Sequence, residues 1–442
     1  MALTANQILK TCERDKVQFL RLQFTDILGM AKNVEVPRRQ FEKALDGQVL
    51  FDGSSIEGFV RIEESDMLLV PDLATFRVFP WNDGPGRVAR VICDIHHPSG
   101  QEFPGCPRLT LQRATAKAKK KGLEMMAGPE AEFFLLQLNA AGQPSLETHD
   151  AAGYFDMAPV DRGEDCRQRI IQALEAMGFE VEAGHHEVAP GQHEIDFRYG
   201  DAVSTADNIS TFRLVVKKVA ADMGLHATFM PKPLFGQNGS GMHTHQSLFR
   251  KGKNVFFDAR APMKLSKTAL HYIGGLLRHA RAMVAVTNPT VNSYKRLVPG
   301  YEAPTMVAWS EKNRSPMIRV PDRRGDATRC ELRMPDPSCN PYLALAVMLT
   351  AGLDGMANKA DPGPPVTKNV YRMSQRERRR LKIEELPGNL NAAVQELKKS
   401  KLLQEALGEH IATHYIAAKE AVWHDYIAQV HTWEHERYLT RY

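Results

Sequence analysis

The spacing of apolar and polar residues divides the chain into a short first part that mixes strands and helices and a longer, more helical second part. Residues 17–25 alternate as a half-buried strand does, and Thr4 can cap a helix in front of them. Similar patterns continue to about residue 95. They predict a helix over 4–13, strands over 17–25 and 32–36 joined by a turn at 26–29, a helix over 39–45, and strands over 75–80 and 87–95. These elements suit a small mixed sheet.

A stretch rich in turn residues, HHPSGQEFPGCP at 96–107, separates this part from the rest. We therefore predict two domains, 1–105 and 106–442. In the second, the pattern predicts helices over 110–121, 165–177 and 205–223, a strand over 128–138, a buried helix at 342–348, and polar helical segments from 369 onward.

Two loops stand out between these elements. Residues 51–67 are rich in glycine and serine, which is typical of loops that carry function on a rigid scaffold. Residues 292–304 combine a charged middle with Pro299 and Gly300, which suits a lid that moves.

The segment GHHEVAPGQHEIDF, at 184–197, predicts a hairpin that brings acids together. Pro190 and Gly191 are the preferred central pair of a type II turn. A symmetric register about them places Glu187 opposite Glu194, where two like charges repel unless a cation lies between them. A divalent metal would meet this need. The alternative is a pair of solvated acids on an exposed ribbon.

Other acids and histidines fall at strand spacing. Glu130 and Glu132 lie two residues apart in the strand expected over 128–138, so they share a face. The glycine-rich segment FGQNGSGMHTHQSLF at 235–249 leaves its backbone open to a ligand and places His243 and His245 on one face. Each acid taken alone could instead form a structural salt bridge, and His243 could be an ordinary core histidine.

Composition narrows the class of protein. The 442 residues are 43% hydrophobic and carry a net charge of only +5, with basic and acidic residues interspersed, so a nucleic-acid partner is not indicated. Six cysteines without a CxxC pair indicate reduced thiols in a cytoplasmic protein. The amino terminus lacks the apolar core of a signal peptide, and no stretch is long enough to suggest a membrane span.

The candidate chemistry is anion binding with phosphoryl transfer. Five glutamates with one histidine suit two or more Mg²⁺ or Mn²⁺ ions rather than zinc. Arginines clustered at 314, 319, 329 and 333 supply the planar cations that bind phosphate and carboxylate. The chain has no GxxxxGK[ST] sequence, so a nucleotide must be held in another way. These residues therefore predict a nucleotide-dependent ligase or kinase.

The motifs resemble those of the glutamine synthetases of the bacterial type I class. The resemblance spans nearly the whole chain and rests on DGSSIEGF at 52–59, GPEAEFF at 128–134, GHHEVAPGQHE at 184–194, NGSGMHTH at 238–245, NSYKRLVPGYEAP at 292–304, NRSPMIRVP at 313–321 and ELRMPDPSCNPYLALA at 331–346. It implies an α+β fold, with a β-grasp-like N-terminal domain and a large catalytic domain whose curved antiparallel sheet is flanked by helices. The implied reaction joins ammonia to glutamate with hydrolysis of ATP.

The resemblance also implies roles for single residues. It suggests Glu132, Glu187 and Glu194 as ligands of the metal that orients glutamate, and Glu130, His243 and Glu331 as ligands of the metal on the ATP phosphates. Arg314, Arg319 and Arg329 resemble phosphate-binding arginines, with His245 and Ser247 beside the nucleotide. Glutamate would contact Asn238, Gly239, His243, Arg296, Glu302 and Arg333, and ammonium would contact Asp52, Ser55, Tyr154, Glu187 and Glu302. Asp52, Glu302 and Arg319 would be catalytic.

Assembly and control follow from the same resemblance. It implies twelve subunits in two stacked hexameric rings, with Asp52 reaching the site of the neighbouring subunit. Arg61 resembles an arginine of the branch inhibited by glutamine, which suggests such feedback and a nitrogen-responsive transcription regulator as partner. Tyr371 lies near the position of a tyrosine that is adenylylated in another branch, but its NVYRMS context departs from that pattern and argues against adenylylation.

The sequence also allows two other functions. One is a ligase of the same family that joins glutamate to an amine or polyamine. The other is a structural or regulatory relative without activity, which should lack several ligands.

Overall fold

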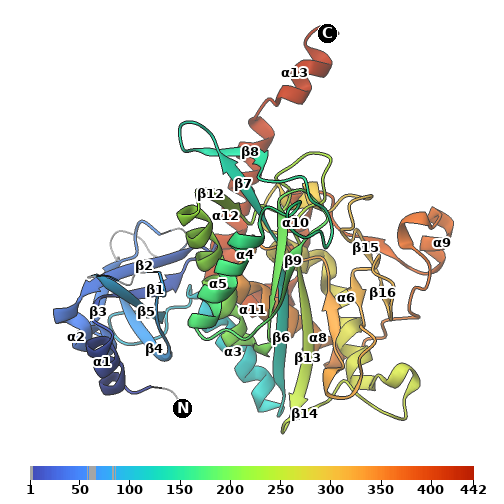
Figure 1. The fold of residues 1–442 in the computed structure, drawn as a ribbon. Coiled ribbons are helices and arrows are strands. Elements are labelled where there is room, and N and C mark those ends of the chain that lie inside the picture. Colours follow the sequence, from blue (N-terminus) through green and yellow to red (C-terminus); the bar gives the residue numbers. More distant parts are fainter. Residues whose placement is uncertain (1–2, 57, 59–65, 82–83, 85) are drawn as a thin grey trace.

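The N-terminal region forms a five-stranded mixed sheet. The computed structural model describes residues 3–56, 58, 66–81, 84 and 86–442 (Figure 1). Strand order is β2-β1-β5-β4-β3, with β1 and β5 parallel and the other neighbours antiparallel. The elements are α1 (Ala5–Arg14), β1 (Val17–Thr25), β2 (Ala31–Pro37), a 3₁₀ turn at Arg38–Gln40, α2 (Phe41–Leu45), β3 (Val49–Asp52), β4 (Asp66–Val78) and β5 (Arg87–His96).

Two further sheets form the centre of the larger region. The first has the order β11-β6-β13-β18-β17-β16, with β14 beside β13, and is antiparallel except between β16 and β17. The second has the order β12-β7-β10-β9, with β8 beside β7. Their strands are β6 (Glu124–Ala131), β7 (Phe133–Leu138), β8 (Pro144–Thr148), β9 (Val181–His186), β10 (Gln192–Phe197), β11 (Gly200–Asp201), β12 (Leu225–Thr228), β13 (Met242–Arg250), β14 (Lys253–Asn254), β16 (Trp309–Ser310), β17 (Ile318–Arg319) and β18 (Cys330–Leu332).

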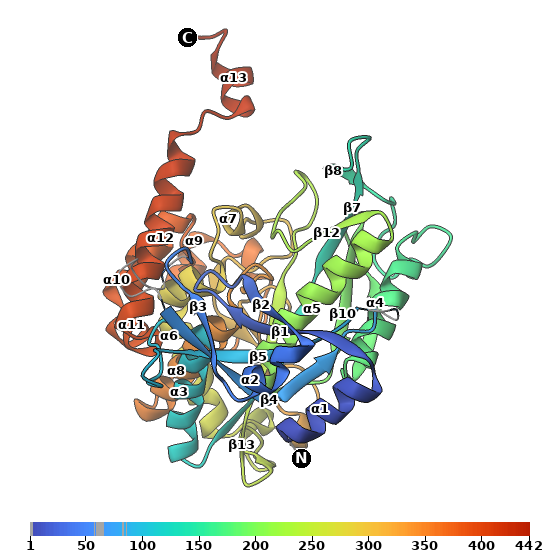
Figure 2. The same ribbon diagram turned by 90° about the vertical axis from the view of Figure 1, so that its left-hand side faces the viewer.

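Helices surround these sheets. Buried apolar side chains of both regions form one continuous core, in which α8 is buried along most of its length. The helices are α3 (Pro107–Lys120), α4 (Glu164–Ala176), α5 (Ala202–Asp222), α6 (Lys267–Thr287), α7 (Ser293–Arg296), α8 (Pro341–Ala357), α9 (Gln375–Arg380), α10 (Leu390–Lys399), α11 (Lys401–Leu407), α12 (Glu409–Ala428) and α13 (Thr432–Tyr438). A short pair, β15 (Met306–Val307) with β19 (Glu384–Glu385), lies beside them. The end of α12 and α13 project away from the body (Figures 1 and 2).

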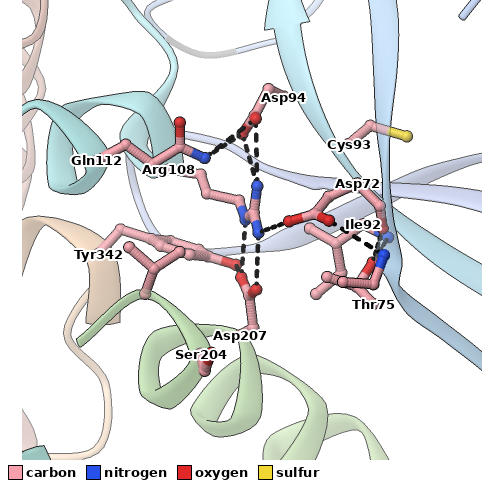
Figure 3. Close-up of polar contacts among 12 residues, drawn as sticks. Asp72, Thr75, Ile92, Cys93, Asp94, Arg108, Gln112, Ser204, Asp207 and Tyr342 are labelled. Atoms are coloured by element: carbon pink, nitrogen blue, oxygen red, sulfur yellow. Dashed lines mark hydrogen bonds and ion pairs between the residues drawn. The ribbon is translucent and has the colours of Figure 1, made fainter. Parts of the chain in front are cut away.

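A buried ion cluster joins the two regions. Arg108 of α3 is ion-paired with Asp72 of β4 at 2.6 Å, Asp94 of β5 at 3.0 Å and Asp207 of α5 at 2.9 Å (Figure 3). Tyr342 of α8 also donates a hydrogen bond to Asp207, at 2.8 Å. Because the guanidinium of Arg108 binds acids from three elements, β4, β5 and α5, it fixes the N-terminal sheet to α3 and α5 of the larger region.

Most elements agree with the sequence pattern, and Thr4 caps α1 as predicted. Three expectations were wrong. The loop predicted over 51–67 is shorter than expected, because β3 extends to Asp52 and β4 begins at Asp66. The strand expected over 128–138 is broken at Glu132, which leaves β6 and β7 in different sheets. The C-terminal helices are amphipathic rather than polar, because α10, α11 and α12 bury Leu397, Leu407 and Ile411.

No described helix has the length and apolar character needed to span a membrane.

Candidate active site

The hairpin of β9 and β10 brings two acids together, but not in the predicted register. Gly191 has φ of +68°, and Gln192 N donates to Ala189 O at 3.0 Å, so the turn is centred where expected. Glu194, however, pairs with His185 rather than Glu187. The register is displaced by two residues, and a displacement of two keeps each side chain on its face. His185 therefore lies between the acids, 3.3 Å from Glu194 and 3.7 Å from Glu187.

The second group of acids comes from three adjacent strands. Glu130 of β6 lies opposite His243 of β13, and Glu331 of β18 lies opposite His245. His243 Nδ1 is 3.5 Å from Glu130 and 3.8 Å from Glu331. Ligand atoms of these three residues all lie within 4.8 Å of one another, which is a separation that one ion can bridge. The antiparallel ladder thus places the predicted set of Glu130, His243 and Glu331 on one face.

Glu132 lies between the two groups. Its backbone N–H donates to Gly241 O at 3.1 Å, and its carboxylate accepts bonds from Gly241 N at 2.9 Å and Gln192 Nε2 at 2.8 Å. All six predicted metal ligands line one cavity of about 280 Å³. A ligand set made mostly of carboxylate oxygens, with one or two imidazoles, fits hard divalent cations.

Burial raises the pKa of three of these carboxyl groups. Burial and the charge of Glu187 raise the pKa of Glu132 to about 8, and burial, followed by Glu302, raises the pKa of Glu187 to about 7. Burial, with Asp196, raises the pKa of Glu194 well above its ordinary value. Ionised acids at these positions need positive charge nearby, and a metal would supply it.

Glu130 and Glu331 behave differently because hydrogen-bonding histidines and an arginine face them. Burial opposes their ionisation, but His243 and His245 outweigh it and lower the pKa of Glu130, while Arg333 and His243 lower that of Glu331. Burial and the charge of Arg333 lower the pKa of His243 to about 4. The imidazole is therefore neutral at pH 7, which is the form that binds metals.

Arginines cover the other side of the cavity. Arg319 and Arg333 both form short ion pairs with the fully buried Glu331. Arg296 is buried and donates to the carbonyl oxygens of Met334 at 2.8 Å and Arg333 at 3.1 Å. It packs against the glycine-rich segment, where a Cβ on Gly241 would lie 2.5 Å from its Nη2. Glycine at this position therefore allows the close approach of Arg296. The predicted approach of a ligand to the same backbone stays a prediction.

A second cavity of about 250 Å³ shares Glu130 with the first. Among its lining residues are His245, Ser247 and Arg329, which the sequence suggested for the nucleotide, together with the aromatic Phe197 and Tyr199. His245 Nε2 is 2.7 Å from Glu130, and Arg329 Nε donates to His245 Nδ1 at 3.1 Å. One cavity can hold an elongated anion while the other holds the metals and a small acid.

Comparison with known proteins places both regions. The family model described as "Glutamine synthetase, beta-Grasp domain" matches residues 16–98, and "Glutamine synthetase, catalytic domain" matches residues 104–438. A curated glutamine synthetase of Thermus thermophilus is 61% identical over 100% of both chains. The chain belongs to the glutamine synthetase family.

Other members of the family agree over the full length. A glutamine synthetase of Methanosarcina mazei is 55% identical and covers 99% of this chain and 98% of its own. Among solved structures, one described as "GmaS/ADP complex-Conformation 1" has a TM-score of 0.90 at 35% identity over 100% of both chains. A glutamine synthetase of Plasmodium falciparum has a TM-score of 0.86 at 25% identity over 99% of both chains. The predicted family and α+β fold are confirmed.

Most of the residues that the family resemblance suggested meet at these two cavities. In addition to the ligands, the first cavity is lined by Tyr154, Asn238, Gly239, Arg296, Glu302, Arg314, Arg319 and Arg333. Asp52 and Ser55 line neither cavity of the described chain, since Asp52 ends β3 in the N-terminal sheet, apart from β6 and β13 (Figure 1). Arg61 lies outside the described residues.

Sequence reasoning missed several side chains at the site. His185, Gln192, Asp196 and Tyr199 all line a cavity or contact a predicted ligand. His185 has the same strand parity as Glu187, so the face rule could have found it. No comparable signal marks Tyr199, because it depends on how β10 approaches β6.

Proposed function

We propose that this chain joins ammonia to the γ-carboxylate of L-glutamate with hydrolysis of ATP, through a γ-glutamyl phosphate, and so makes glutamine for nitrogen assimilation. One observation carries the proposal: all six candidate metal ligands and four arginines line one cavity, which adjoins a second cavity lined in part by aromatic residues. The membership of the full chain in the glutamine synthetase family supports the same reaction.

The residues divide the task by charge. Glu132, Glu187 and Glu194 would hold one Mg²⁺ or Mn²⁺, and Glu130, His243 and Glu331 another. Bound there, the cations neutralise the phosphates and the γ-carboxylate so that the two anions can approach. Arg314, Arg319 and Arg329 bind the phosphates, with His245 and Ser247 beside the nucleotide. Arg296 and Arg333 bind glutamate, next to the backbone of Asn238 and Gly239.

Two acids handle protons around the nucleophile. The γ-carboxylate attacks the γ-phosphorus of ATP and ADP leaves, which gives an acyl phosphate. Asp52, with Ser55, Tyr154 and Glu187 around the ammonium, takes one proton to make ammonia. Ammonia then displaces phosphate from the acyl carbon, and Glu302 takes a further proton and closes the site.

The position of Asp52 supports an assembly with shared sites. Asp52 is exposed and lines neither cavity of its own chain, which supports a role for it at the site of a neighbouring subunit. We propose the family arrangement of two stacked hexameric rings, a domain boundary near residue 105, glutamine feedback that requires Arg61, and a nitrogen-responsive transcription regulator as partner.

Coupled product assays test the reaction. Purified protein with ATP and Mg²⁺ should form glutamine and phosphate in equal amounts, and both should depend jointly on glutamate and ammonia. Ethanolamine and putrescine replace ammonia in parallel reactions. Turnover with either amine but not with ammonia, or no glutamine at all, would refute the proposal. Unchanged glutamine inhibition in Arg61→Ala would refute the feedback.

A further inference from the structure

The loop that carries Glu302 is held at two points beside the first cavity. Glu302 has φ of +57°, a left-handed conformation that is costly for a residue with a side chain. Its carboxylate lies over the cavity and accepts a bond from Asn238 Nδ2 at 3.3 Å. A strained conformation persists only when its surroundings impose it. Contacts on each side of Glu302 must therefore hold the loop in place.

On the C-terminal side, the contact is made by Tyr371. Its hydroxyl donates a hydrogen bond to the carbonyl oxygen of Ala303 at 2.5 Å. Burial raises the pKa of Tyr371, so the hydroxyl keeps the proton that this bond needs. The ring packs against a small separate core that contains Met306, Val370 and Met373.

The base of Tyr371 is itself rigid. Asn369 caps the 3₁₀ turn at Val370–Arg372, and Val370 N donates to Ser315 Oγ at 3.1 Å. The strand pair of β15 and β19 and the bond from Leu386 N to Thr305 O, at 2.9 Å, fix the chain just after the loop. Tyr371 therefore joins the loop to a fixed part of the molecule.

On the N-terminal side, the contact is a cation on an aromatic ring. Lys232 Nζ lies 3.6 Å from the centre of the Tyr301 ring and also donates to Gln237 O. Lys232 is buried, and its backbone exchanges two hydrogen bonds with Asn292, at 2.7 and 3.0 Å. A buried cation over a ring is a strong contact of its type.

We propose that Tyr371 and Lys232 are positioning residues that hold residues 301–303 closed over the reacting groups, Tyr371 through the Ala303 carbonyl and Lys232 through the Tyr301 ring. The inference rests on the proposed function, because it assigns these contacts to protection of the acyl phosphate. If the loop opens, water attacks the acyl carbon, phosphate leaves and glutamate is regenerated. The net reaction is then hydrolysis of ATP to ADP and phosphate without glutamine.

The test compares phosphate with glutamine in the full-length Tyr371→Phe variant. Phenylalanine keeps the ring and its packing and removes only the hydroxyl. A neutral hydrogen bond corresponds to a change of about three- to tenfold in the equilibrium between closed and open loop. We expect glutamate-dependent phosphate release without ammonia to rise by about that factor relative to the wild type, and the ratio of phosphate to glutamine to exceed one.

Tyr294→Phe is the matched control. Its ring is buried nearby in α7, and its hydroxyl has no hydrogen-bond partner in the described part of the chain, so the ratio should stay at one. The N-terminal contact has its own pair: Tyr301→Phe keeps the aromatic face under Lys232, whereas Tyr301→Leu removes it. Only the leucine variant should release excess phosphate.

The outcomes separate this proposal from the function it rests on. A wild-type protein that makes no glutamine would refute the proposed function itself. A wild type that makes glutamine, with Tyr371→Phe giving the same product ratio, would overturn the role of Tyr371. An equal loss of phosphate and glutamine would also overturn the role of Tyr371. A structural defect lowers the amount of active protein without changing the ratio of phosphate to glutamine. Faster amide exchange of residues 299–305 in Tyr371→Phe would support the role.

Discussion

At the scale of single residues, the site is defined by carboxyls whose protonation depends on what lies beside them. Glu331 is fully buried but ionised, because Arg319 and Arg333 contact it. Glu132 and Glu187 are buried against each other, and their pKa values rise to about 8 and 7. The charged neighbours of a buried glutamate therefore decide whether it is ionised or protonated near pH 7.

These pKa values predict how stability and metal binding vary with pH. A carboxyl whose folded pKa is raised stabilises the protein below its unfolded pKa, and this contribution is lost as pH rises through the folded pKa. The metal-free protein should therefore lose thermal stability between about pH 6 and 8. A divalent cation replaces the protons, so Mg²⁺ should raise the melting temperature more at pH 8 than at pH 6.

Thermal melts with EDTA or Mg²⁺ across this range measure the effect. Glu132→Gln is the informative variant, since Glu132 has a higher pKa than Glu187. The metal-free melting temperature of this variant should depend less on pH. An equal Mg²⁺ effect at both pH values would contradict the assignment.

At the scale of elements, the sequence predicted which side chains share a strand face better than it predicted how the strands pair. Periodicity placed Glu130, His243 and Glu331 on faces that the β6, β13 and β18 ladders bring together. Periodicity could not predict which residue pairs with Glu194. Gln192 forms backbone hydrogen bonds with both Glu187 and Ala189, so the turn between the strands is asymmetric and shifts the pairing by two residues. The break at Glu132 was equally hidden, since it depends on a bond to Gly241 over a hundred residues away.

Below the hairpin, Gly163 limits how β10 can move. A Cβ there would lie 2.4 Å from the His193 ring and 2.6 Å from His149 Nε2. Gly163→Ala should therefore lower the free energy of unfolding by about 1–3 kcal/mol. It should also weaken Mg²⁺ binding, because His193 precedes Glu194 on the same strand. Urea unfolding and calorimetric titration with Mg²⁺ measure both. Gly388→Ala, which would meet no atom within 4 Å, should change neither.

At the scale of the whole molecule, Arg108 forms a polar link between the two regions (Figure 3). Arg108→Met would leave the buried Asp207 carboxylate with the Tyr342 hydroxyl as its one hydrogen-bond donor among the described residues. Breaking a buried pair on one side costs about 3–5 kcal/mol, so calorimetry should show a much lower melting temperature. Arg113→Met, one turn and a half along α3, removes an exposed pair with Glu102 and a hydrogen bond to Thr110 Oγ1 at 2.8 Å, and it leaves no charge buried without a partner, so it should have little effect. Similar losses in both variants would show that the cluster is not what joins the regions.

The proposed assembly predicts that neighbouring subunits share each site, and this can be tested directly. Glu331 lines the first cavity, whereas Asp52 lies in the N-terminal sheet of the same chain and does not reach it. Asp52→Ala and Glu331→Gln should each be inactive alone. When the two variants are co-expressed, some sites between neighbours will combine an intact Asp52 from one subunit with an intact Glu331 from the next. Random mixing in a ring with one kind of interface makes that fraction about a quarter, so about a quarter of the wild-type glutamine formation should return. If each chain built its own site, every site would carry one of the two substitutions, and co-expression would restore nothing.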